Sequence, residues 1–342
     1  MHSELEKRLV QSDKLIQRCA AGKALPLIIC LATFAGNSHG TDATDITNKS
    51  MTVTNPSCAA YLGQMQSTVK DVNTNRSFTG TVEITEKDTH CQFATNAIPN
   101  HDFNDGKRAF RNEVSEQYMV VTVSKSPQLA SSVTPLSLSY DNAVFLNGVK
   151  LDLLAAACYG VGRGQLGQEK IGCGDRHSDN PWRYDPLSAL NDFGTDSHHA
   201  HAQPDGSYHY HGGPQVLYDS NCDINQTPSP VVGFAADGFP VYGPCFDDNG
   251  TIRKAQSGFV LKSGLRQPVE GYETPATPHV ASNRYDGQFR GDYEYVASTG
   301  DLDECNGMQV NGQYGYYITD QYPWVMSCFK GTPDPTFAKR RR

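Results

Sequence analysis

Short β-type stretches separated by turn residues constrain the fold of this chain more than any other feature. Between residues 77 and 138, stretches such as 78–84 and 118–123 carry β-branched and aromatic side chains, with Asn, Gly, Pro and Asp between them. Outside two short segments, no window sustains the 3.6-residue hydrophobic period of a helix. With 31 Gly and 19 Pro, the pattern predicts a mainly β fold: one large, sandwich-like domain of many short strands with long ordered loops.

The clearest local prediction is a hairpin over residues 143–152. Asn147 and Gly148 lie between two apolar runs, and both residue types readily adopt the positive φ of a tight hairpin turn. Two further segments are short enough to form only minor elements. Residues 151–160 are compatible with a short helix or a buried strand, and residues 186–193 with a single helical turn.

The first 40 residues differ in composition from the rest. Five Lys/Arg precede an apolar run of 13 residues at 24–36, which is typical of a secretory signal and shorter than the roughly 20 residues of a spanning helix. We therefore expect residues 1–40 to be a signal peptide, with export to the periplasm or the cell exterior and no membrane span; a buried N-terminal helix is the alternative. Residues 41–57 are expected to form a flexible linker, 58–335 the β domain and 336–342 a basic tail.

Cysteine spacing supports an oxidising compartment. Eight cysteines remain beyond residue 40, and an even number in an exported chain predicts four disulfides. Eight cysteines allow 105 connectivities, so the pairing of sequence neighbours is only the simplest arrangement. No Cys-x-x-Cys occurs, which argues against a cysteine zinc site or a thioredoxin-like motif. The simplest pairs are Cys58–Cys91, Cys158–Cys173, Cys222–Cys245 and Cys305–Cys328.

The charge of the chain limits its partners. Residues 1–40 contain five Lys/Arg and three Asp/Glu, so their removal changes the formal net charge from −8 to −10. An acidic exported chain is poorly suited to nucleic acid or anionic lipid. We therefore expect no nucleic-acid partner.

The segment from His198 to His211 carries five of the eleven histidines. If Tyr208–His211 is a strand, His209 and His211 share one face and the two tyrosines the other. The two imidazoles would then lie about 6–7 Å apart along the strand, a span that one metal ion can bridge. The preceding Pro204-Asp-Gly206 favours a turn that brings His201 beside them. The spacing therefore predicts a three-histidine site.

The candidate metal ligands are His201, His209 and His211, with His101 of a polar loop as a candidate fourth. Imidazole ligands suit zinc, copper, iron or nickel better than calcium or magnesium, and we favour copper or zinc. His198 and His199 precede the expected strand and are weaker candidates. The alternative is that these histidines pack with tyrosines and bind backbone groups.

Several further residues are candidates for supporting roles. A carboxylate that accepts from the second ring nitrogen would orient a ligating imidazole. Tyrosine hydroxyls beside the site, and a carboxylate in the Gly/Pro-fixed loop 233–244, would line a pocket. These candidates are Asp196, Asp205, Tyr208, Tyr210 and Asp237.

Several motifs together resemble the YHYH domain family of bacterial exported proteins, over roughly residues 95–331. They are Tyr-His-Tyr-His at 208–211, Ile-Pro-Asn-His-Asp at 98–102, Phe-Leu-Asn-Gly-Val at 145–149, Ala-Ala-Asp-Gly-Phe-Pro-Val-Tyr-Gly-Pro at 235–244 and Asp-Glu-Cys-Asn-Gly at 303–307. The resemblance implies export and a single domain. It implies no particular reaction or ligand.

Three functions are compatible with these observations. The first is a protein that binds or buffers a transition metal outside the cytoplasm. The second is a metalloenzyme, in which three histidines leave a coordination position open for water or oxygen; no HExxH, GxSxG or phosphate loop accompanies the cluster. The third is a surface module that binds glycan or protein through its 17 tyrosines, with structural histidines.

Overall fold

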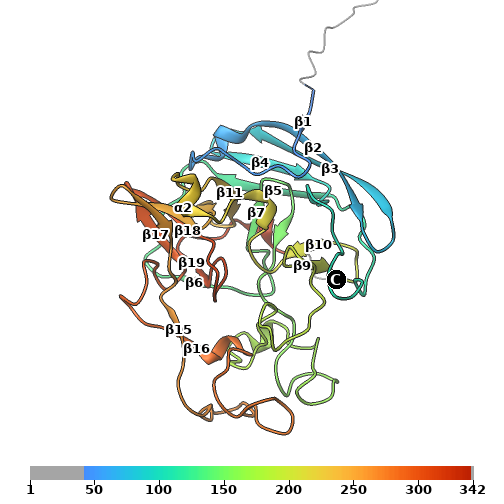
Figure 1. Ribbon diagram of the computed structural model, residues 1–342, viewed down its shortest axis with the longest axis vertical. Helices are drawn as coiled ribbons and strands as arrows, with labels where there is room; N and C mark the ends of the chain where they lie inside the picture. Colours follow the sequence, from blue (N-terminus) through green and yellow to red (C-terminus); the bar gives the residue numbers. More distant parts are fainter. Residues whose placement is uncertain (1–41, 340–342) are drawn as a thin grey trace, which may run out of the picture. The chain divides into compact units, whose positions relative to one another are not determined.

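The computed structural model describes residues 42–339, and the predicted signal peptide lies outside them. Two sheets carry most of the strands (Figure 1). The five-stranded sheet has the order β1 (Thr44–Asp45), β2 (Gly63–Asp71), β3 (Arg76–Glu86), β4 (His90–Thr95) and β5 (Met119–Ser124). The eight-stranded sheet has the order β17 (Gly307–Val310), β18 (Gln313–Tyr317), β12 (Pro240–Tyr242), β11 (Val231–Ala235), β7 (Ala143–Phe145), β8 (Lys150–Leu151), β10 (Tyr208–Tyr210) and β9 (Ala200–Ala202).

Three two-stranded sheets and short helices complete the described part of the chain. The pairs are β13 (Cys245–Asp248) with β14 (Thr251–Lys254), β15 (Phe259–Leu261) with β16 (Tyr293–Tyr295), and β19 (Cys328–Phe329) with β6 (Thr134–Pro135). The helices are α2 (Cys222–Asn225) and the 3₁₀ turns Cys58–Tyr61, Asp175–His177, Gln215–Leu217, Arg290–Asp292 and Pro335–Phe337. Residues 186–193, expected to form a helical turn, contain hydrogen-bonded turns and irregular backbone but no helix. The mainly β fold is confirmed, with 31% strand and 6% helix.

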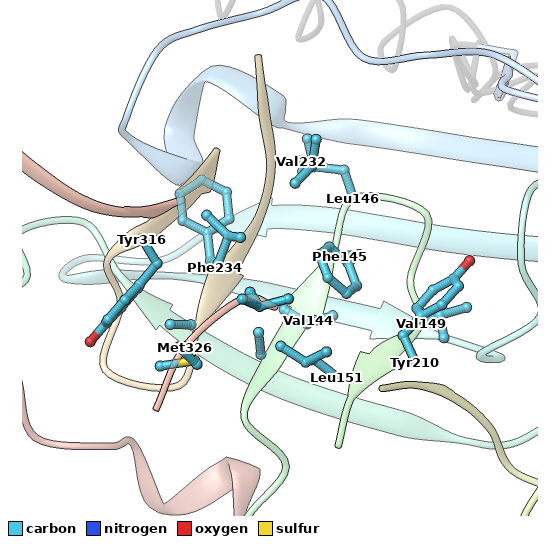
Figure 2. Packing of buried hydrophobic residues seen from close by; sticks show 14 of the residues in the cluster. Val144, Phe145, Leu146, Val149, Leu151, Tyr210, Val232, Phe234, Tyr316 and Met326 are labelled. Carbon is cyan, nitrogen blue, oxygen red and sulfur yellow. The ribbon is translucent and has the colours of Figure 1, made fainter. Parts of the chain in front are cut away.

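The two large sheets share one apolar core. Alternate residues of β3, β4 and β5 are buried, which is the pattern of a sheet with one covered face. Phe93 of β4 packs against Phe234 of β11, with ring centroids 6.1 Å apart. Figure 2 shows Phe145, Leu151 and Tyr210 in this core, so the strand β10 that carries the histidines is anchored in it through a tyrosine.

The hairpin at 143–152 forms, but its turn differs from the expected one. The N–H of Gly148 donates to the carbonyl of Phe145, and the N–H of Phe145 donates to the carbonyl of Val149, which makes a three-residue loop. Only Gly148 has positive φ, at 82°, and Asn147 does not. Asn147 is instead buried and turned inward, where its amide donates to Tyr210 Oη. Asn147 therefore serves both the turn, where its Oδ1 accepts from the N–H of Val149, and the core.

All four disulfides join the sequence neighbours named above, which confirms the simplest pairing. The bonds are Cys58–Cys91, Cys158–Cys173, Cys222–Cys245 and Cys305–Cys328. Among residues 42–339, no helix has the length and apolar character needed to cross a membrane.

Both ends of the described chain are more structured than the composition suggested. The expected linker contains β1, which pairs with β2, and Val53 accepts a hydrogen bond from Val231. At the other end, Phe337 is buried and Lys339 forms ion pairs with Asp152 and Asp141, so the part of the expected basic tail up to residue 339 is docked. Main-chain hydrogen bonds order the expected linker at residues 41–57, and such bonds cannot be predicted from amino-acid composition.

Candidate metal centre

A short antiparallel hairpin, β9 and β10, carries the candidate ligands. His209 lies directly opposite His201, and Tyr208 lies opposite Ala202. The turn between the strands contains Gly206 at a φ of 84°, a conformation that favours glycine. On the other side of β10, the parallel neighbour β8 places Lys150 beside His209. The predicted turn thus brings His201 across from His209, as the spacing required.

The three imidazoles converge on one point. Nε2 of His211 lies 3.1 Å from Nε2 of His209 and 3.2 Å from Nε2 of His201. A ligand atom from each residue lies within 4.8 Å of the other two. Ligands bound at about 2.0–2.1 Å to one zinc ion in tetrahedral or similar geometry are separated by roughly 3–3.5 Å. Two of the three separations already match that range.

Hydrogen bonds on the opposite ring nitrogens orient two of the three imidazoles, whereas Nδ1 of His211 has no hydrogen-bond partner among residues 42–339. Nδ1 of His201 lies 2.8 Å from the carbonyl of Phe193, and Nδ1 of His209 lies 3.4 Å from the carbonyl of Ser207. Since a carbonyl only accepts, these contacts place the proton of each ring on Nδ1 and leave Nε2 with a free lone pair. This is the tautomer that ligates a metal through Nε2.

Burial keeps the three imidazoles neutral. His209 and His211 are buried and His201 is half-buried. Desolvation lowers the pKa of His201 and His209, and lowers that of His211 to about 3, with the neighbouring histidines adding to the effect for His209 and His211. A neutral imidazole is the form that binds metal, so the site is ready for a cation without first releasing a proton.

His101 does not join this group, which corrects the expected ligand set. Its Nδ1 donates to the carbonyl of Asp102 at 2.7 Å, and its Nε2 accepts from the hydroxyl of Tyr210 at 2.7 Å. Both nitrogens are therefore engaged. Tyr210 alternates with His209 and His211 along the chain, so His101 lies on the opposite face of β10. The ring of His198 packs against that of His101, with centroids 3.6 Å apart and the ring planes tilted by 32°.

Asp196 organises the start of the hairpin rather than an imidazole. Its Oδ1 accepts from the backbone N–H of His198 and of Ala200, and its Oδ2 accepts from the hydroxyl of Tyr208 at 2.7 Å. Burial raises the pKa of Asp196 to about 6. Asp205 accepts from the N–H and hydroxyl of Ser207 and shapes the turn between the strands.

Asp237 lies away from the histidines. Its Oδ2 accepts from the hydroxyl of Tyr316 at 2.6 Å and from the N–H of Gly331 at 2.9 Å. It follows β11, and β7 and β8 lie between β11 and β10 in the sheet, a span of roughly 14 Å at the usual strand spacing. Asp237 therefore fixes the β11–β12 turn and does not line the triad.

Replacing Asp196 with Ala is expected to lower the unfolding free energy by about 2–3 kcal/mol, because four buried or part-buried donors lose their acceptor. Denaturant unfolding measures the change. Asp88 is exposed between β3 and β4, so Asp88→Ala is a matched control and should stay within about 0.5 kcal/mol of the parent. Equal stability of the two variants would contradict this role for Asp196.

A partly buried charge network beside the triad was not anticipated from the sequence. Lys150 pairs with Asp141 at 3.2 Å, and Lys339 pairs with Asp152 at 2.5 Å and with Asp141 at 3.6 Å. Gln203 donates to Asp152 at 3.1 Å. Lys150 and Asp152 alternate after the Asn147–Gly148 turn, which would place them on one face. The parallel pairing that brings that face to the histidines has no local sequence signal.

The comparison with known families matches the part of the chain that holds the triad. The model of the family described as YHYH protein matches residues 120–331, more than half of the chain and including all three converging histidines. His101 falls outside the matched range. No curated protein and no solved structure matches the chain. Because the match covers most of the described domain, the chain belongs to the YHYH family.

Proposed function

We propose that this chain is an exported protein that binds one transition metal ion, copper or zinc, through His201, His209 and His211. The four disulfides are compatible with an oxidising compartment, and they support export. The ligand set is all nitrogen, which favours copper or zinc over calcium or magnesium.

The convergence of the Nε2 atoms carries this proposal. Nδ1 of His201 and of His209 faces a carbonyl, so Nε2 of each ring presents a lone pair. Nε2 of His211 lies close to both, and a neutral imidazole can donate a proton to only one of them. At least one contact therefore brings two lone pairs together. A shared cation relieves that repulsion, and neither tyrosine packing nor a hydrogen bond does so for all three rings.

The surface-module alternative receives less support from the tyrosines. Ten of the 17 tyrosines are buried and serve the core, so they offer little surface to a partner. The buried ones are Tyr159, Tyr184, Tyr208, Tyr210, Tyr218, Tyr242, Tyr314, Tyr316, Tyr317 and Tyr322.

Elemental analysis of the untagged protein tests the proposal. Wild-type protein equilibrated with Cu²⁺ or Zn²⁺ and then desalted should retain about one ion per chain, and the His209→Ala/His211→Ala variant should retain none. His279 is exposed, so His279→Gln is a matched control that should bind like the wild type. Circular dichroism checks that the variants are folded. Equal retention by the wild type and the double variant would refute the triad as the site.

A further inference from the structure

The strand register places one carboxylate on the face of the sheet that holds the triad. In the parallel pair β8–β10, Lys150 is opposite His209 and Leu151 is opposite Tyr210. The N–H of Asp152 donates to the carbonyl of Tyr210, so the pairing continues and brings Asp152 beside His211. Since side chains alternate along strands, Asp152 shares a face with His209 and His211.

A second contact confirms this placement from the β9 side. Gln203 follows His201 by two residues, and its N–H donates to the carbonyl of Ser207, which extends the antiparallel pairing of β9 and β10. Its side-chain amide donates to Oδ2 of Asp152 at 3.1 Å. Asp152 is thus held by Tyr210, which follows His209, and by Gln203, which lies two residues after His201.

One oxygen of Asp152 is engaged and the other is not. Oδ2 binds Gln203 and the ammonium of Lys339. Oδ1 is buried and has no hydrogen-bond partner among residues 42–339. The residue as a whole is only 3% exposed, so bulk water does not reach this oxygen. A buried carboxylate oxygen without a donor is costly, because the charged group has lost its water and has gained no hydrogen bond in return. A ligand of the site that carries an O–H would satisfy it.

Asp152 is not within the group of ligand atoms itself. The cluster of side chains that can share one ion contains the three histidines alone among the described residues. A carboxylate just outside such a cluster is placed to act on what the ion binds. Three ligands leave at least one coordination position open, because zinc and copper take four or more ligands.

We propose that Asp152 holds the exchangeable ligand of the triad, with Oδ1 accepting a hydrogen bond from a water molecule at the open coordination position. The inference rests on the proposed metal site. It specifies a neutral, protic ligand at that position, because the negative charge of Asp152 attracts O–H donors and repels anions. Asp152 is a positioning residue: it fixes where the exchangeable ligand sits and which kind of ligand is accepted.

Asp141 offers a matched comparison within the same charge network. It is also an aspartate with a largely buried side chain, and it pairs with Lys150 and Lys339. The charge of Asp152 acts on His201 and His211, whereas the groups that act on Asp141 are Lys150, Lys339 and Asp152, with no histidine among them. Replacing Asp141 therefore perturbs the network without removing the carboxylate that faces the triad.

Anion binding to cobalt-substituted protein tests the inference. Co²⁺ is loaded into the wild type and into Asp152→Asn and Asp141→Asn variants, and azide is titrated against the visible absorption of the ion. Asp152→Asn should bind azide at least about tenfold more tightly, because a unit negative charge on the triad's face of the sheet is removed. Asp141→Asn should change the azide affinity by less than about threefold. Azide affinities of Asp152→Asn and wild type that agree within threefold would overturn the inference.

A second variant changes the same quantity in the opposite direction. Lys339→Met removes the ammonium that pairs with Asp152 and partly screens its charge, so azide should bind about tenfold more weakly than in the wild type. This arm keeps the inference testable if Asp152→Asn fails to fold, and an unchanged affinity in Lys339→Met would then contradict it. Wild-type protein that takes up no metal refutes the proposed function. If the wild type binds Co²⁺ but neither variant differs from it in azide affinity, the role of Asp152 is refuted and the metal site stands.

Discussion

Lowering the pH from 7 to 4 is expected to reduce the unfolding free energy of the metal-free protein by about 4 kcal/mol. The cause is the set of buried neutral histidines. Burial lowers the pKa of both His101 and His211 to about 3, from an ordinary value of 6.5. Below pH 6.5 these groups bind protons in the unfolded chain and not in the folded one.

The sign of the effect follows from that difference. Because the unfolded state binds more protons, folding loses stability as the pH falls from 6.5 toward 3, by about 3 kcal/mol at pH 4 for each of the two histidines. Asp196 opposes this trend. Burial raises its pKa to about 6, so the folded protein keeps a proton that the unfolded chain releases, which offsets about 2 kcal/mol over the same interval. The histidines prevail because there are more of them.

Denaturant titrations in the presence of a chelator, at several values of pH between 7 and 4, measure this dependence. In His101→Gln the loss of unfolding free energy between pH 7 and pH 4 should be about 3 kcal/mol smaller than in the wild type. This difference does not depend on the stability of the variant at pH 7, because the change with pH reports only on groups that titrate. The exposed His279 serves as the control site, and His279→Gln should reproduce the wild-type curve. A His101→Gln curve parallel to that of the wild type would show that His101 is not held neutral by the fold.

Much of the triad could be predicted because its geometry is local. His209 and His211 are fixed on one face by strand alternation alone, and His201 is only eight residues from His209 across a turn rich in Pro, Asp and Gly. The disulfides follow similar logic, since each joins cysteines that are neighbours in sequence. Short-range geometry therefore carried these predictions.

The remaining parts of the site depend on long-range pairing. His101 meets Tyr210 over 109 residues, and which face of β10 it approaches is set by how the two sheets pack. Asp152 reaches the triad through the parallel pair β8–β10, whose strands are separated by more than 50 residues. Asn147 shows a further limit: the sequence indicated its place in the turn but not that its buried amide donates to Tyr210. No local pattern distinguishes these arrangements from their alternatives.

Zn²⁺ at a thousandfold excess over its dissociation constant is expected to raise the unfolding free energy of the wild type by about 4 kcal/mol at pH 7. The ion binds the folded chain, where three Nε2 atoms already converge, much more strongly than the unfolded chain, where they do not. Burial has also lowered the pKa of these imidazoles, so protons compete weakly for the same lone pairs. The gain should therefore persist well below pH 6.

The denaturant midpoint, at unchanged slope, measures the gain, and a chelator should reverse it. His209→Ala/His211→Ala should show no shift of its midpoint with Zn²⁺, because a single remaining imidazole cannot hold the ion against water. Eight histidines outside the triad are common to both sequences, so any zinc bound to the unfolded chain or the surface acts on both proteins. The difference between the two midpoints thus isolates the triad. Equal shifts in the wild type and the variant would mean that the ion acts elsewhere and that the three converging histidines do not bind it.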